Sequence, residues 1–254
     1  MAYIMYIINP MKRRSFIKTS AIAGLGLSVF PSLSLQYSNG FISYEELIGK
    51  GQPELFGNGF SLRQEAHNAF IELVSEALKS DIRIQTVSSY RSFAHQNRIW
   101  ERKYKQNITN GLSPENSINK IIEYSTIPGT SRHHWGTDLD IIDGKVKQPS
   151  NVLNPVHFED NGCFSKLKSW MDVHANTFGF YLVYTNTNNR QGFKYEPWHY
   201  SYKPLSKLYL KTYKNYNLKT IINSEDLMGA EHFSNEFIDN YLKKNILDIN
   251  PELL

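Results

Sequence analysis

The sequence predicts an α+β fold in which a central antiparallel sheet is flanked by helices. Three observations support this class. Apolar residues recur at helical spacing in several segments, and short alternating segments between them are typical of strands. The two kinds of segment do not follow the regular strand–helix order of a parallel sheet. Of the 254 residues, those after position 36 suffice for one hydrophobic core with an appended subdomain.

The expected helices are recognised by their caps and their apolar periodicity. Ser61 opens a capping-box pattern, and apolar residues follow it at three- and four-residue intervals. Ser92 and Ser113 are further N-cap candidates, and Gly179 suits the position just after a helix. We expect helices at 61–79, 92–106, 113–124, 163–178, 204–214 and 234–246.

The expected strands alternate apolar and polar residues over short runs. We place strands at 82–88, 137–142 and 180–185, and an extended segment at 193–202. Pro197 lies inside that last segment and makes a helix there unfavourable. The sheet is therefore expected to bring distant parts of the chain together.

Charge and composition exclude several classes of protein. The chain carries 28 Lys+Arg and 24 Asp+Glu, a net charge of +4, and 41% of its residues are hydrophobic. Residues 1–36 hold four of the cations and no acid, so the remaining chain is neutral. A nucleic-acid partner is not expected, because such proteins usually carry a basic excess. The single cysteine, Cys163, excludes an internal disulfide framework and is expected to be a small buried hydrophobe.

The first 36 residues are predicted to be an export signal. Residues 12–18 read Lys-Arg-Arg-Ser-Phe-Ile-Lys and precede a short, interrupted apolar stretch, which resembles a twin-arginine signal. Met11 is an alternative start of translation, since an apolar segment precedes the basic run. A stable membrane span is not expected after cleavage, because the apolar stretch is too short. An uncleaved N-terminal anchor is the alternative. We expect the protein in the periplasm or cell envelope.

Three short segments carry candidate chemistry: 88–92, 131–140 and 196–199. Two imidazoles and a carboxylate are a usual zinc ligand set, with a fourth position left for water. A carboxylate beside that water can act as general base. The residues alone leave two interpretations open. One is a metal-dependent hydrolase, and the other is a set of structural histidines with ordinary turn acids.

The same segments resemble those of zinc D-alanyl-D-alanine carboxypeptidases of the VanY type, which share a wider fold with Hedgehog signalling domains. The matching motifs are Ser89-Tyr90-Arg91-Ser92, Ser131-x-His133-x-x-Gly136-x-x-x-Asp140 and Glu196-Pro197-Trp198-His199. Their order and separation also agree, and the resemblance covers residues 55–203. It implies one zinc peptidase domain at 37–254, with this motif core and a C-terminal helical extension at 204–254.

The resemblance also implies a role for each matching residue. The Zn²⁺ ligands would be His133, Asp140 and His199. Glu196 would be the general base, and Arg91 would bind a terminal carboxylate or the developing oxyanion. Substrate contacts are expected from Ser131 and Gln96.

Two residues depart from the family pattern. His134 follows His133, and on an extended chain the two side chains would point to opposite faces, so only one can be a ligand. Asp138 occupies a position at which the family usually has a small residue, and it lies on the same strand face as Asp140. We expect it either to orient a ligand or to compete as one.

The predicted function is therefore removal of a terminal D-amino acid from peptidoglycan stem peptides. The alternatives on the same site are an L,D-carboxypeptidase and a peptidoglycan endopeptidase. Two further alternatives belong to other classes. One is a non-catalytic wall-binding module, and the other is a metal nuclease that uses the adjacent histidines.

Overall fold

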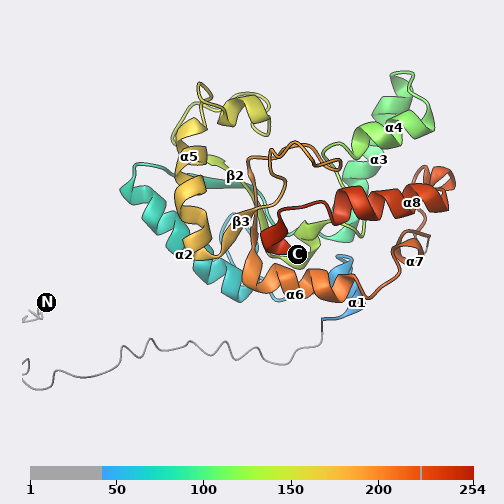
Figure 1. Cartoon of the computed structure of the whole chain (residues 1–254), viewed down its shortest axis with the longest axis horizontal. Coiled ribbons are helices and arrows are strands. Elements are labelled where there is room, and N and C mark those ends of the chain that lie inside the picture. The colour runs from blue at the N-terminus through green and yellow to red at the C-terminus, as the bar shows by residue number, and fades with distance from the viewer. Residues whose placement is uncertain (1–41, 224) are drawn as a thin grey trace, which may run out of the picture. The chain divides into compact units, whose positions relative to one another are not determined.

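A four-stranded antiparallel sheet forms the centre of the computed structural model, which describes residues 42–223 and 225–254 (Figure 1). Its strand order is β1-β2-β4-β3. The bounds are β1 Ile84–Ser88, β2 Asp138–Asp143, β3 Phe180–Leu182 and β4 His199–Tyr202. The expected α+β class with an antiparallel sheet is confirmed.

The register between β2 and β4 decides which side chains meet. Asp138 lies opposite Ser201, and Asp140 lies opposite His199. Directly opposed residues of an antiparallel pair project from the same face, and every second residue shares that face. One face of two neighbouring strands therefore carries two carboxylates, an imidazole and a hydroxyl.

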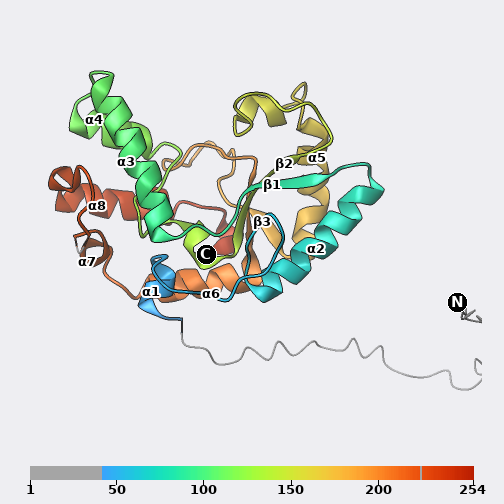
Figure 2. The ribbon, with the colours of Figure 1, turned by 180° about the vertical axis from the view of Figure 1, so that it is seen from behind.

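The helices gather at two ends of this sheet. In both views, α2 and α5 lie at one end, and α3, α4, α7 and α8 lie at the other (Figures 1 and 2). The α-helices are α1 Tyr44–Leu47, α2 Gln64–Lys79, α3 Phe93–Thr109, α4 Pro114–Ile121, α5 Ser165–His174, α6 Lys203–Tyr213, α7 Leu218–Asn223 and α8 Asn235–Tyr241. Shorter turns are η1 Arg132–Trp135, η2 Pro155–Phe158, η3 Ala175–Phe178, η4 Ala230–His232, η5 Leu242–Ile246, which is a π-helical continuation of α8, and η6 Pro251–Leu253.

Most helix boundaries follow their caps, but one does not. The hydroxyls of Ser92 and Ser113 accept backbone N–H groups at the starts of α3 and α4, and Gly179 ends η3 with φ 79°. Ser61 was the wrong cap for α2, which begins at Gln64. The backbone of Ser61 instead bonds to residues 89–90, and residue 62 pairs with residue 56 in an isolated bridge. Cys163 is exposed, so the expectation that it is buried was also wrong.

The C-terminal segment from α6 onward packs into the same core as the motif segments. Tyr241 is buried, and its hydroxyl accepts the backbone N–H of Ile127 at 3.1 Å. Asn250 donates its side-chain amide to the carbonyl of Leu182, at 2.9 Å. The segment thus supports the loop at Ile127 and the end of β3.

The export signal expected at residues 1–36 lies outside the described residues. Among the helices of residues 42–223 and 225–254, we find none with both the length and the apolar character that crossing a bilayer requires.

Candidate metal centre and active-site cleft

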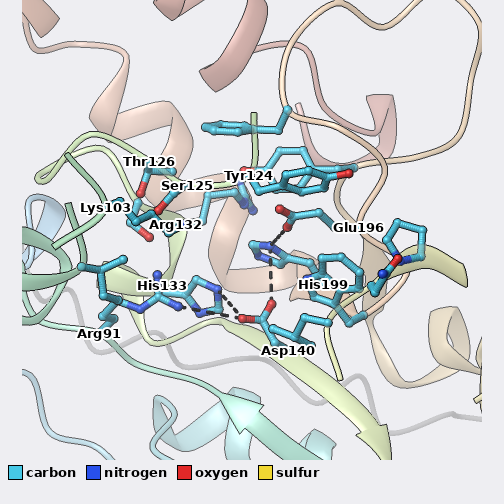
Figure 3. A pocket seen from close by; sticks show the side chains of 18 of the residues that line it. Arg91, Lys103, Tyr124, Ser125, Thr126, Arg132, His133, Asp140, Glu196 and His199 are labelled. Carbon is cyan, nitrogen blue, oxygen red and sulfur yellow. Dashed lines mark hydrogen bonds and ion pairs between the residues drawn. The ribbon is translucent and has the colours of Figure 1, made fainter. Parts of the chain in front are cut away.

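His133, Asp140 and His199 come together beside the two central strands of the sheet (Figure 3). Each offers one ligand atom, and these atoms all lie within 4.8 Å of one another. All three residues are buried. Asp140 comes from β2 and His199 from β4, where the register places them opposite one another, and His133 comes from the η1 turn.

Gly136 allows the chain to turn from η1 into β2. Its φ of 69° lies in the left-handed region, which glycine adopts without steric cost. A Cβ at this position would also lie 2.9 Å from a side-chain carbon of Leu55. Glycine at this position therefore sets how His133 is placed relative to the strand that carries Asp140.

The backbone fixes the ring of His133. Its Nδ1 lies 2.9 Å from the carbonyl oxygen of Ser89, so that nitrogen must carry the proton and donate it. Its Nε2 lies 3.3 Å from Oδ2 of Asp140. The second nitrogen is thus the one free to coordinate a cation, in the arrangement usual for histidine ligands.

His199 is held from its far side by Asp138. Its Nε2 lies 3.1 Å from Oδ1 of Asp138, while its Nδ1 lies 3.0 Å from Oε2 of Glu196 and 3.7 Å from Oδ1 of Asp140. Burial alone would lower the pKa of His199, but the hydrogen bonds to Asp138 and Glu196, with the charge of Asp140, raise it to about 10. The carboxylates around His199 therefore favour a positively charged group near its Nδ1.

Asp138 lies at the centre of a buried polar network. Its carboxylate accepts hydrogen bonds from Nε of Arg132 at 3.0 Å and from the hydroxyls of Ser201 at 3.0 Å and Thr137 at 2.5 Å. Burial would raise the pKa of Asp138, but Arg132 and His199 hold it below its ordinary value. Asp138 is absent from the group of three close ligand atoms. Its contacts are those of a residue that orients His199.

The donor set fits a divalent cation. Oδ1 of Asp140 is buried and has no hydrogen-bond partner among the described residues. Burying an acceptor without a partner is costly unless a donor or an ion faces it. Two imidazole nitrogens and one carboxylate oxygen are the ligand types that zinc prefers in sites that keep an open position.

Glu196 lies beside this group without belonging to it. It comes from the turn that precedes β4, where its backbone N–H donates to the carbonyl of Tyr184 at 3.2 Å. Burial raises the pKa of Glu196, and the hydrogen bond to His199 opposes that effect. A carboxylate with a raised pKa is suited to exchange protons near neutral pH.

Arg91 faces the same centre from the segment that links β1 to α3. Its two terminal nitrogens donate to Oε1 of Gln96 at 2.7 Å and to the hydroxyl of Ser88 at 2.8 Å, and one lies 3.9 Å from Oδ2 of Asp140. Gln96 is fully buried, and its amide group donates to the carbonyl of Thr126 at 2.7 Å. The structure therefore places Gln96 behind Arg91.

A cleft of about 480 Å³ opens over these residues. Ser131, Arg91 and Glu196 line it together with the three candidate ligands, whereas Gln96 does not. The structure thus brings six of the seven predicted site residues to one cleft.

His134 plays a different part from the one its neighbour plays. The pair lies in the η1 turn, so the expectation of an extended chain at this point was wrong. Nε2 of His134 accepts the backbone N–H of Gly129 at 3.2 Å, and its Nδ1 donates to the carbonyl of Arg91 at 2.5 Å. Burial lowers the pKa of His134 to about 3, so the ring is a neutral connector of two loops.

Several cleft residues were not identified from the sequence. Lys103 lies seven residues after Gln96 on α3, and this helical spacing is a signal that would have placed both on one face. Arg132 precedes the candidate ligand His133, but nothing local predicts its contact with Asp138. Ser125 and Thr126 line the cleft from a loop without a motif.

The fold and the cleft together define the class of metal-dependent hydrolases. The features of this class are a buried metal-binding group with an adjacent carboxylate and an adjacent arginine in an open cleft. The sequence profile of the VanY family, described as D-alanyl-D-alanine carboxypeptidase, matches residues 59–205. The chain therefore belongs to the VanY family of carboxypeptidases, as its motifs indicated.

Individual relatives agree with this assignment. An uncharacterized protein of Haemophilus influenzae is 33% identical over 107 residues, which make up 41% of this chain and 82% of that protein. The bifunctional D-Ala-D-Ala dipeptidase and D-Ala-D-Ala carboxypeptidase VanXYC of Enterococcus gallinarum is 29% identical over 57% of this chain and 72% of its own length. The solved structure of VanYB in complex with D-alanine-D-alanine shares the fold, with a TM-score of 0.50 and 21% identity over 70% of this chain and 92% of VanYB.

Proposed function

We propose that this protein is an exported zinc-dependent D,D-carboxypeptidase that removes the terminal D-amino acid from peptidoglycan stem peptides. One observation carries the proposal: the candidate ligand group, Glu196 and Arg91 all line one cleft. Membership of the VanY family and the likeness to VanXYC support the choice of substrate.

Zinc is proposed to be held by Nε2 of His133, a carboxylate oxygen of Asp140 and Nδ1 of His199. When bound, zinc supplies a Lewis acid that polarises the scissile carbonyl and lowers the pKa of a water to about 7. Asp138 holds the ring of His199 through Nε2, and the carbonyl of Ser89 holds the ring of His133.

Glu196 is proposed to move the protons of the reaction. Its carboxylate accepts a proton from the attacking water and then delivers that proton to the amine of the departing amino acid. Burial keeps its pKa raised, which brings it closer to neutral pH, where such transfers are efficient. Glu196 lies outside the ligand group, so a proton-transfer role does not require it to leave the metal.

Arg91 is proposed to stabilise the negative charge that develops on the scissile carbonyl oxygen. One terminal nitrogen of Arg91 lies 3.9 Å from Oδ2 of Asp140, and this short distance to a proposed ligand supports the role. Gln96 and Ser88 hold the guanidinium in place, so Gln96 would act through Arg91. Ser131 lines the cleft and remains a proposed direct contact to the substrate.

Export rests on the sequence of the first 36 residues. The Arg13-Arg14 pair and the apolar stretch after it support delivery to the periplasm or cell envelope by a twin-arginine-like signal. A peptidase of cell-wall peptides would meet its substrate there.

The test is mass spectrometry of purified stem peptides after incubation with the zinc-loaded protein. Loss of one D-alanine from a peptide ending in D-Ala-D-Ala is the expected result. Loss of a D-residue that follows an L-residue would indicate an L,D-carboxypeptidase, and cleavage within cross-linked peptides would indicate an endopeptidase. Unchanged peptides that nevertheless bind would indicate a wall-binding module. Glu196→Gln provides the matched inactive control.

A further inference from the structure

Among the described residues that line the cleft, Lys103 is a partly buried cation without a role in the proposed chemistry. Four cationic residues line the cleft: Arg91, Arg102, Lys103 and Arg132. Arg91 lies near Asp140, and Arg132 is paired with Asp138 at 3.0 Å. Arg102 is exposed to solvent. Lys103 is half-buried, and its ammonium group forms no ion pair or hydrogen bond with any residue of 42–223 or 225–254.

The surroundings of Lys103 suit an anion. Ser125 and Thr126 line the cleft on the same side as Lys103, across from Glu196 (Figure 3). Oγ1 of Thr126 is buried and has no hydrogen-bond partner among the described residues. An ammonium group and an unpaired hydroxyl together can satisfy the oxygens of one carboxylate.

Burial makes the unpaired charge of Lys103 costly. Loss of hydration lowers the pKa of Lys103, and the like charges of Arg102 and Arg91 act in the same direction, while the charge of Glu196 across the cleft opposes them only in part. The carboxylates that line the cleft are Asp140 and Glu196, and both already face histidines at the metal group. An incoming carboxylate would therefore provide the ion-pair partner that the described residues do not give to Lys103.

We infer that Lys103, together with the hydroxyl of Thr126, binds the free terminal carboxylate of the peptide substrate and thereby makes the enzyme a carboxypeptidase. This inference rests on the proposed function and deepens it. The division of labour follows from position: Arg91 serves the reacting carbonyl beside the ligands, and Lys103 serves the carboxylate at the end of the peptide. A peptide without that free carboxylate gains nothing from Lys103.

The experiment compares two ligands that differ only at their end: a stem peptide ending in D-Ala-D-Ala and the same peptide with a C-terminal amide. Binding is measured by calorimetry on zinc-loaded Glu196→Gln protein, so that the result does not depend on turnover. Adding Lys103→Met should weaken binding of the acid peptide about 10- to 100-fold, as expected for a lost charged hydrogen bond. Binding of the amide peptide should change little.

Two further variants make the test specific. Lys105→Met on the same helix is the control, because Lys105 is exposed and pairs with Glu101 at 3.2 Å outside the cleft. Lys103→Arg should restore part of the preference for the acid peptide. Zinc content and melting temperature verify that each variant is folded.

Three results would overturn the inference: an unchanged acid-to-amide ratio in Lys103→Met, loss of the preference in Arg102→Gln instead, or failure of both peptides to bind. Failure of the proposed function has a separate signature. In that case, wild-type protein would release no D-alanine from the acid peptide, whether or not the peptide binds.

Discussion

Replacing Asp138 by asparagine tests how the metal centre is supported. The substitution keeps the size of the side chain but removes its charge. In the native protein, this carboxylate accepts hydrogen bonds from Arg132, Ser201, Thr137 and the Nε2 side of His199. An asparagine side chain has one acceptor oxygen, and its NH₂ group would face donors.

The expected loss of stability follows from the burial of this network. Arg132 and Asp138 are both buried, and Nη1 of Arg132 already has no partner among the described residues. Removing one member of a buried ion pair typically costs about 3–5 kcal/mol, because the remaining charge is left uncompensated. A domain with a free energy of unfolding of about 5–15 kcal/mol would be strongly destabilised but could still fold.

The expected effect on the metal follows from His199. Without the charged carboxylate of residue 138 opposite its Nε2, the ring of His199 is held less firmly, and its Nδ1 becomes a weaker ligand. Loss of such an outer partner usually lowers metal affinity about 10- to 100-fold. Zinc affinity is measured by competition with a chromophoric chelator, and stability by urea denaturation with and without zinc.

Asp143→Asn provides the matched control. Asp143 is a buried carboxylate on the same strand, but it accepts the backbone N–H groups of Arg83 and Lys145 away from the cleft. This variant should lose about 1 kcal/mol of stability and no zinc affinity. If Asp138→Asn bound zinc as tightly as the wild type, the assignment of Asp138 as the residue that orients His199 would be wrong.

Three further predictions concern chemistry, ligand choice and export. Glu196→Gln should retain its zinc and its fold while kcat falls about 10²- to 10⁴-fold, because glutamine cannot accept the proton of the water; near-normal kcat in steady-state assays would remove Glu196 from the mechanism. His133→Ala should lose zinc in metal analysis, whereas His134→Ala should keep zinc and instead lower the melting temperature, because two loops lose their connector; the reverse pattern would exchange their roles. Replacing Arg13 and Arg14 by lysine should leave precursor in the cytoplasm on cell fractionation, and normal export would indicate the general secretory route.

Features set by short-range chemistry were predictable from the sequence. Ser92 and Ser113 cap helices with their own hydroxyls. This contact involves only the three residues that follow each serine. Ser61 has the same local pattern, but its backbone is used by a bridge and by residues 89–90, so the helix begins later. Local patterns therefore fail where distant segments compete for the same backbone groups.

The candidate ligands were predictable for a different reason. His133, Asp140 and His199 belong to motifs whose spacing reflects a turn and two strands, so a family resemblance identifies them together. The contacts of Asp138 with Arg132 and Ser201 depend on strand register, which one sequence does not provide. Lys103 matches no motif, and its proposed role depends on its place in the cleft and on the lack of an ion-pair partner among the described residues.

The sheet register has a consequence for the order of folding. Asp138 and His199 touch, although 61 positions separate them along the chain, and His133 meets Ser89 across 44 positions. Closing such long loops is slow, because chain entropy is lost before the contacts form. A chain in which β2 has not yet paired with β4 has only part of the ligand set. Zinc would therefore bind after the central strands have paired, and it would stabilise the protein mainly by slowing unfolding, with little effect on the folding rate.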